Sequence, residues 1–389
     1  MSRPEIEGGA VAVRGGIITD VGDSSHILET HKGEVVDLGD GILLPGFVNA
    51  HTHLELSALK GKVGGGAGFV DWVRQVMLKR MELPGEQIES ALLKQVHLLS
   101  SSGTVLLGEV TNTGLSQPLL SESGLRATVF HEVIGFNGED ADDIFSRALT
   151  GLRDMETGGR LRTTMSPHGP HSVSTTLIRK ISAYVGEGAG GTMIHLAESR
   201  EENLFIREGR GPFRDFLDER GVWDPSWVRC PRGPVSYLDG LGFLRPGTLC
   251  VHLAQADEED LRLLARRGAA ACICPRSNSH TGVGPPPVEA MLKAGLKIAL
   301  GTDSLASVGD LNILAEAQYL HGMGRGIEPR TAVSMFTRNG AEALGWSELG
   351  SISEGKIARF ALAPVLSGPC GDPYEYLLER IDPEEVKVV

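Results

Sequence analysis

The sequence predicts an α/β fold, a (β/α)8 (TIM) barrel of the metal-dependent hydrolase type, with a small β-sandwich domain built from both ends of the chain. Short apolar, β-branched runs alternate with segments whose apolar residues recur every three or four positions, as in βαβ units. Eight such runs occur, the number in a closed parallel barrel. The 389 residues exceed by roughly 140 the about 250 that a barrel needs, which leaves room for an accessory domain.

Each of the eight runs is apolar enough to be buried on both faces of a parallel sheet. The predicted strands are Ile42–Asn49, Thr104–Val110, Arg126–Val133, Leu161–Pro167, Gly191–Ala197, Thr248–Leu253, Ala269–Pro275 and Leu296–Gly301. Helical periodicity is clearest in four segments between them, Ile88–Ser100, Thr175–Val185, Glu202–Glu219 and Glu258–Arg267.

The two ends of the chain have a different pattern. Gly9–Val21 and Ser351–Pro364 are short apolar runs interrupted by glycine, which is typical of strands joined by tight turns. Because they flank the barrel in the sequence, we expect them to form one composite β domain of residues 1–45 and 346–389. The catalytic barrel then comprises residues 46–345.

Composition excludes several classes of protein. Lys and Arg total 37 against 50 Asp and Glu, a formal charge of −13 that disfavours nucleic acid and membrane partners. No apolar run approaches the ~18 residues that span a bilayer, and no signal-peptide core is present. The five cysteines form no CxxC pair, so we expect free thiols rather than a disulfide framework. These features predict a cytoplasmic protein that acts on a small molecule.

Polar residues stand at the ends of four predicted strands. His51 and His53 end the first strand and, because side chains alternate along a strand, point to one face. His195 ends the fifth strand, His252 the sixth, and Asp303 follows the eighth. A single histidine of this kind is usually a satisfied core residue, but five such groups would each need a buried partner. They predict one divalent metal at the carboxyl end of the barrel, with donors that favour Zn²⁺ and also suit Fe²⁺ or Mn²⁺.

Taken together, these segments resemble the amidohydrolase superfamily, in its branch of metal-dependent deaminases and chlorohydrolases. The resemblance covers nearly the whole chain and rests on PGFVNAHTHLELS, SPHGPHSVS, IHLAES, CPRSN and GTDSLAS, in family order. It implies that His51, His53, His195 and Asp303 hold the metal and that the barrel carries a β-sandwich from both termini. Whether the N-terminal part of that domain is complete stays open.

The resemblance also implies catalytic roles. Glu198 matches the proton shuttle, which protonates a ring nitrogen beside the amino-bearing carbon and later passes a proton to ammonia. On its own, Glu198 is equally typical of a carboxylate at a helix N-terminus. His252 and Asp303 orient the attacking water, and His252 stabilises charge on its oxygen. Because Leu161–Pro167 contains no Lys, Glu or Cys that would bridge two ions, we expect a single metal.

Substrate contacts are less well defined by the sequence. His168 matches a substrate-contacting histidine, and Trp72 lies where relatives place groups that cover the substrate, although helix packing explains Trp72 equally well. The roles of His171, Arg80 and Glu82 stay open.

Two further features bear on the site. Glu109 is either an extra ligand or, as we favour, a strand-end residue bonded to loop backbone. The long connections Leu54–Gly103 and Glu198–Gly247 follow strands that carry ligands, so they are expected to form the pocket wall. The cytidine-deaminase fold is excluded because no PCxxC accompanies His53-Leu54-Glu55.

Within the branch, the HTHLELSALKG segment, the stretch around Phe69 to Trp72 and GTDSLAS look most like deaminases of 6-amino-6-deoxyfutalosine. That substrate is an adenosine with a 5′ extension, and it belongs to the futalosine route of menaquinone biosynthesis. The alternatives are deaminases of S-adenosylhomocysteine, methylthioadenosine, guanine or cytosine, triazine chlorohydrolases, and an inactive binding protein of the same fold. Dimers are common in the family, which leaves homodimer formation open.

Overall fold

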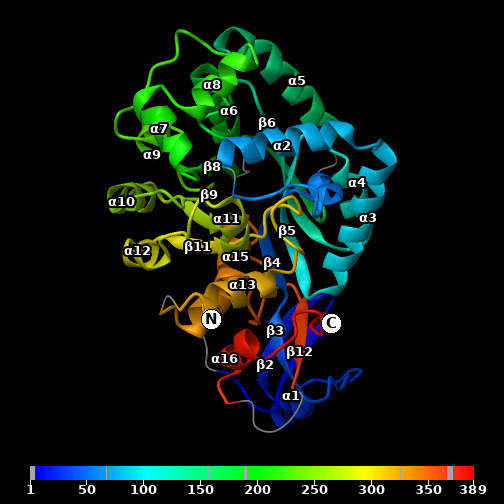
Figure 1. Cartoon of the computed structure of the whole chain (residues 1–389). Coiled ribbons are helices and arrows are strands. Elements are labelled where there is room, and N and C mark those ends of the chain that lie inside the picture. Colours follow the sequence, from blue (N-terminus) through cyan, green and yellow to red (C-terminus); the bar gives the residue numbers. More distant parts are fainter. Residues whose placement is uncertain (1–4, 67, 156–157, 188–190, 325, 366–370) are drawn as a thin grey trace.

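The computed structural model describes residues 5–66, 68–155, 158–187, 191–324, 326–365 and 371–389. Parallel strands alternate with helices through the central part of the chain, so the predicted α/β order is confirmed (Figure 1). The strands form two four-stranded parallel sheets, ordered β4-β5-β6-β7 and β11-β10-β9-β8. Their bounds are β4 (Phe47–Thr52), β5 (Thr104–Thr111), β6 (Arg126–Val133), β7 (Leu161–Pro167), β8 (Thr192–Leu196), β9 (Thr248–His252), β10 (Ala270–Ile273) and β11 (Lys297–Leu300).

Hydrogen bonds join the two sheets at both seams. The His195 backbone N–H donates to the His168 carbonyl at 2.9 Å, which connects β8 to the end of β7. At the other seam, the Asp303 N–H donates to the His51 carbonyl at 3.0 Å, and Thr52 pairs with Asp303 in a parallel bridge. Of the functional residues predicted at strand ends, His195 therefore lies at one seam, and His51 and Asp303 lie at the other.

The helices begin and end at recognisable sequence signals. In α10, Asp257 and Asp260 form a capping box, and Gly268 ends the helix in a left-handed conformation. The helices and short 3₁₀ segments of the central region are η1 (Leu54–Leu59), α2 (Phe69–Glu82), α3 (Gly85–Ser101), α4 (Ser116–Ser123), η2 (Gly138–Asp140), α5 (Ala141–Asp154), α6 (Thr175–Glu187), α7 (Arg200–Glu208), α8 (Pro212–Glu219), α9 (Pro234–Gly240), α10 (Glu258–Arg267), α11 (Pro275–Thr281), α12 (Val288–Lys293), α13 (Ile313–Gly322), α14 (Pro329–Met335) and α15 (Arg338–Ala343). None of the helices described here is long and apolar enough to cross a membrane.

One helix predicted as continuous, Glu202–Glu219, is divided into α7 and α8. Gly209 takes a left-handed φ of 72° and ends α7, and Pro212 begins α8 at a position where its missing N–H costs nothing. The periodicity continues across the break because both helices bury an apolar face, and this explains the error.

Strands from both ends of the chain share one antiparallel sheet, ordered β13-β12-β3. β1 and β2 pair as a separate hairpin, as predicted, around Gly15 and Gly16, whose positive φ values of 59° and 78° suit a tight turn. Figure 1 shows β2, β3 and β12 together at one end of the molecule. The bounds are β1 (Gly9–Arg14), β2 (Ile17–Asp23), α1 (Ser24–Thr30), β3 (Gly41–Pro45), β12 (Phe360–Pro364), α16 (Pro373–Glu379) and β13 (Lys387–Val388). The sandwich architecture and the domain limits stay predictions.

The first predicted strand, Ile42–Asn49, is in fact two strands with different partners. β3 pairs with β12, whereas β4 pairs with β5. Gly46 separates them, and a Cβ at this position would lie 2.4 Å from the Val105 side chain. The close approach requires glycine, and the chain changes sheets there.

A second apolar cluster lies between the parallel strands and is separate from the core beneath the helices. It includes Val48, Phe130, Met193 and Val251, and Trp346 closes one side with its Nε1–H donated to Thr128 Oγ1 at 3.0 Å. The cysteines within the described residues, Cys230, Cys250, Cys272 and Cys274, are free as expected, and Cys370 lies outside those residues.

Candidate metal centre

The ends of β4 and β11 bring three predicted ligands together. The Nε2 atoms of His51 and His53 lie 3.2 Å apart. Asp303 Oδ1 is 3.9 Å from the first and 3.7 Å from the second. Because these atoms face one another in a nearly dry site, a shared cation accounts for their arrangement better than mutual hydrogen bonding.

His195 and His252 join this cluster from β8 and β9. Candidate donor atoms of His51, His195 and His252 all lie within 4.8 Å of one another. The Nδ1 of His195 meets the His168 carbonyl at 2.9 Å, and the Nδ1 of His252 meets Asn278 Oδ1 at 2.9 Å. Since each Nδ1–H donates to an oxygen, each Nε2 is left as an acceptor directed at the centre.

Burial keeps the imidazoles neutral, which is the form that binds metals. It lowers the pKa of His195 and His252 to about 4 and holds the pKa values of His51 and His53 well below the usual range, with further lowering from neighbouring histidines. The donor set, the free Nε2 atoms and the neutral rings fit a divalent metal.

Asp303 is fixed by hydroxyl groups. Its Oδ2 accepts from Ser277 Oγ at 2.6 Å and from Ser307 Oγ at 3.4 Å, so Oδ1 faces the histidines. Burial raises the pKa of Asp303, and the Ser277 hydrogen bond opposes that shift.

Glu198 lies at the same carboxyl end of the parallel strands, with Oε1 3.5 Å from His252 Nε2. Its pKa is raised well above the usual range by burial and further by the charge of Asp303. Sequence reasoning missed Glu202, whose two carboxylate oxygens accept from the backbone N–H groups of Ala197 and Glu198 at 2.9 and 2.8 Å. The only sequence signal was a second carboxylate one helical turn after Glu198.

Strained backbone is concentrated here. Among the described residues, positive φ outside glycine occurs at Ala197, His252, Leu253 and Asp303, with values between 49° and 72°. All four follow or end strands at the site. Such conformations are costly and persist where the surrounding structure fixes them, as at functional sites.

Two buried carboxylates support the loop after β4. Glu109 accepts from Thr52 Oγ1 at 2.7 Å and from Leu54 N–H at 3.2 Å, as the favoured interpretation predicted. Glu55 accepts from Thr113 Oγ1 at 2.8 Å and Leu115 N–H at 3.0 Å. Both carboxylates therefore have structural partners.

A third buried carboxylate, Glu132, was also missed from the sequence. Its Oε2 accepts from Asn112, whereas its Oε1 is 3.7 Å from His195 Nδ1 and has no hydrogen-bond partner among the described residues. In the sequence Glu132 looks like an ordinary residue of a buried strand. No neighbouring residue indicates that it lies close to His195.

Of the two predicted substrate contacts, His168 lies beside this cluster and Trp72 is buried in α2. The rings of His168 and His195 are 4.8 Å apart, and His168 Nδ1 meets Ser172 Oγ at 2.6 Å, so its Nε2 is free of that contact. The buried Trp72 packs on Phe69 with ring centroids 5.8 Å apart, and its indole Nε1 lacks a hydrogen-bond partner among the described residues.

Of the residues left open by the sequence, His171 lies beside His168 with ring centroids 5.4 Å apart, and its buried Nδ1 has no hydrogen-bond partner among the described residues. His171 is buried against Phe213, with ring centroids 4.2 Å apart. Glu82 is exposed and paired with Lys79 at 2.8 Å, and Arg80 is half-buried in the last turn of α2. Glu82 thus behaves as surface charge.

The two long connections contact each other, and their role as a pocket wall stays a prediction. Phe69 of α2 contacts Phe213 of α8 with ring centroids 6.1 Å apart, and Arg74 pairs with Glu219 at 2.6 Å. The Phe69 N–H also donates to Glu201 Oε1 at 3.1 Å. Both segments follow strands that carry candidate ligands.

Comparison with known proteins agrees with this geometry. A model of the amidohydrolase family matches residues 42–364. The aminodeoxyfutalosine deaminase of Deinococcus radiodurans is 31% identical over 350 residues, covering 87% of this chain and 81% of the relative. The 5-methylthioadenosine/S-adenosylhomocysteine deaminase of Bacillus cytotoxicus is 27% identical over 390 residues, covering 96% of this chain and 85% of the relative.

Solved structures share the fold. An aminofutalosine deaminase of Helicobacter pylori, in complex with methylthio-coformycin, has a TM-score of 0.85 at 24% identity, over 98% of this chain and 95% of that one. An adenosine deaminase of Xanthomonas campestris with bound zinc has a TM-score of 0.84 at 24% identity, over 98% and 86%. The chain therefore belongs to the amidohydrolase family, among its hydrolases that remove ammonia by deamination.

Proposed function

We propose that the protein is a mononuclear, zinc-dependent deaminase of amino-purine nucleosides, with 6-amino-6-deoxyfutalosine as its preferred substrate. The observation that carries this proposal is the convergence of four metal-ligand side chains and Glu198 in a chain 31% identical to an aminodeoxyfutalosine deaminase. The reaction replaces the 6-amino group of the purine by oxygen and releases ammonia. It would take place in the cytoplasm, on a route to menaquinone.

The proposed architecture is a closed (β/α)8 barrel of residues 46–345, with a β-sandwich of residues 1–45 and 346–389. Hydrogen bonds at both seams and the shared β3–β12 pairing support it. The barrel places the ligands of four strands at the carboxyl end, where the active sites of such barrels lie.

In this proposal His51, His53, His195 and Asp303 hold the metal. When bound there, Zn²⁺ would lower the pKa of its water towards ~7 and polarise it for attack. Every other part of the chemistry is assigned to side chains of this chain. The β7 segment Leu161–Pro167 offers no Lys, Glu or Cys to bridge a second ion.

Glu198 moves protons between water, purine and leaving group. Its raised pKa, caused by burial and the Asp303 charge, suits a carboxyl group that both accepts and donates near neutral pH. It would protonate the ring nitrogen next to the amino-bearing carbon, which makes that carbon more electrophilic, and later protonate the departing ammonia. His252, 3.5 Å from Glu198, would stabilise negative charge that develops on the attacking oxygen.

Substrate binding is assigned to His168 and Trp72. The free Nε2 of His168 can hydrogen-bond a hydroxyl or ring nitrogen, and the unpartnered Trp72 Nε1–H can donate to a substrate oxygen or nitrogen. The contacting segments around α2 and α8 would cover the substrate and exclude water from it.

A panel of purine nucleosides that differ at the 5′ position tests this assignment, with turnover followed by the adenine-to-hypoxanthine change in absorbance. We expect the highest kcat/KM for 6-amino-6-deoxyfutalosine. Higher kcat/KM for methylthioadenosine or S-adenosylhomocysteine would select the second candidate, which the 27% identity over 96% of the chain favours. Faster turnover of guanine or a chlorotriazine than of any 5′-extended adenosine would refute both.

A further inference from the structure

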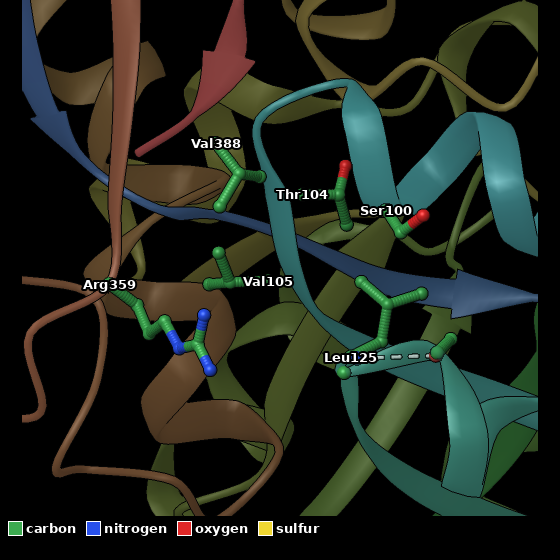
Figure 2. Close-up of a pocket in the computed structure, with 8 residues that line it drawn as sticks. Ser100, Thr104, Val105, Leu125, Arg359 and Val388 are labelled. Carbon is green, nitrogen blue, oxygen red and sulfur yellow. Dashed lines mark hydrogen bonds between the residues drawn. The ribbon is translucent and has the colours of Figure 1, made fainter. Parts of the chain in front are cut away.

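A small pocket lies at the opposite end of the barrel strands from the metal centre. Its lining comes from the start of β5, from the turn between α4 and β6, and from Arg359 and Val388 near the C-terminus (Figure 2). Its volume is about 80 Å³. A nucleoside or cofactor site has about 300 Å³ or more, so this pocket suits only a small ion or molecule.

Arg359 is the one charged side chain that lines this pocket, and Figure 2 shows it beside Val105. The hydroxyls of the lining residues Ser100 and Ser123 already donate to the carbonyls of His97 and Leu120, at 2.9 Å each. The guanidinium is therefore the principal donor toward an occupant. Its planar array of N–H groups matches the oxygens of an oxyanion.

A second arginine, Arg126, adds positive charge next to the pocket. It directly follows the lining residue Leu125, and its Nη1 is buried without a hydrogen-bond partner among the described residues. Burial lowers the pKa of Arg126, and the charges of Arg359 and Arg160 lower it further. Glu348 offsets this repulsion only in part, because it is paired with Arg162 at 2.7 Å.

Two guanidiniums close to one small pocket, one of them with an unpartnered buried Nη1, are unusual in a chain whose formal charge is −13. An unpaired buried donor destabilises the folded protein, and like charges nearby add to that cost. A bound anion would remove both costs. We propose that this pocket binds a tetrahedral oxyanion such as phosphate or sulfate, held by Arg359 and Arg126, and that the anion links the start of β6 to the C-terminal strands.

The test uses the metal-loaded full chain and inorganic phosphate as the probe. Calorimetric titration and thermal unfolding are compared for phosphate, sulfate and acetate at constant ionic strength made up with chloride. We expect saturable binding and a rise in Tm with phosphate and sulfate but not with acetate. Arg359→Gln should weaken phosphate binding about tenfold or more, because a charge-assisted pair of hydrogen bonds is lost. Arg153→Gln, an exposed substitution on α5, should leave binding unchanged.

The repulsion between the two arginines supplies an independent readout. Without phosphate, Arg359→Gln should have a Tm equal to or above that of the unsubstituted protein, and in saturating phosphate the order should reverse. Arg359→Lys, which keeps the charge but loses the planar donors, should give intermediate affinity. Equal phosphate affinity in Arg359→Gln, or an equal rise in Tm with acetate, would overturn the proposal. Deaminase turnover plays no part in these readouts, so they stand apart from the proposed function.

Discussion

Glu198→Gln keeps the shape of the buried side chain but removes its ability to carry a proton. The residue is 4% exposed, and Oε1 lies 3.5 Å from His252 Nε2, so an isosteric amide fits the same space. General acid–base catalysis contributes about 10²–10⁴ to a rate, or about 3–5 kcal/mol of activation free energy. Because one carboxyl group serves two proton transfers in the proposed reaction, we expect kcat to fall toward the upper end, about 10⁴-fold.

Stability and metal content should respond differently from turnover. At neutral pH an ionised Glu198 is disfavoured by burial and by Asp303, which is why its pKa is raised. The neutral amide removes that penalty, so Tm should equal or exceed that of the unsubstituted protein, and one metal ion per chain should remain bound.

The assay combines steady-state absorbance kinetics, elemental analysis of bound metal and thermal unfolding. Glu208→Gln, an exposed substitution at the end of α7, the helix that begins just after Glu198, is the matched control and should retain full turnover. A kcat within about tenfold of the unsubstituted enzyme would remove Glu198 from the proton-transfer role. Loss of the metal would instead make Glu198 a ligand.

Three further substitutions test the supporting structure. Glu202→Ala leaves the N–H groups of Ala197 and Glu198 buried without acceptors, so we expect a loss of about 1–3 kcal/mol per N–H in urea unfolding and a lower kcat that Glu202→Gln partly restores. Glu316→Ala removes the carboxylate that Arg276 contacts through N and Nε at 2.7 and 2.6 Å, and should cost about 1–3 kcal/mol because these N–H groups lose their buried acceptor while Asp310 still pairs with the guanidinium at 3.0 Å; an unchanged urea midpoint would contradict this. Burial raises the pKa of Asp260 from an ordinary 3.8 to about 6. Between these pH values the folded state binds more protons than the unfolded state. The stability that the protonated Asp260 contributes is therefore lost as pH rises through about 6. Asp260→Asn should therefore flatten Tm against pH between 4 and 6, and an unchanged slope would refute the assignment.

The strand-end positions of the candidate ligands could be predicted because they follow from local rules. Buried strands are recognisable by their apolar runs, alternation places His51 and His53 on one face, and parallel strands gather their carboxyl ends. The break at Gly46 was not predicted, because it depends on the close approach of Val105, a residue far away in the sequence. Gly209 and Pro212 did indicate the break between α7 and α8. The apolar periodicity continues across both residues, and the prediction of one helix followed that periodicity.

The groups that orient the site were harder to predict. Asn278 lies 26 residues along the chain from His252, whose ring it orients. Glu132 of β6 lies 3.7 Å from the His195 ring of β8, a residue that is distant in the sequence. The positive φ of His252 and Asp303 could not be predicted from residue type alone, because His and Asp, although enriched at positive φ, have a negative φ at most positions. Tertiary structure imposes these features, so only the folded geometry displays them.

Stepwise reconstitution with Zn²⁺ tests the metal-dependent deaminase most directly. Metal would be removed from the purified protein by chelation and added back in fractions of an equivalent, with ammonia release from a 5′-extended adenosine measured at each step. We expect no turnover without metal, a linear rise that ends at one equivalent per chain, and no recovery in His51→Ala. Full turnover in the chelated protein, or a rise that continues to two equivalents, would contradict a single metal held by His51, His53, His195 and Asp303.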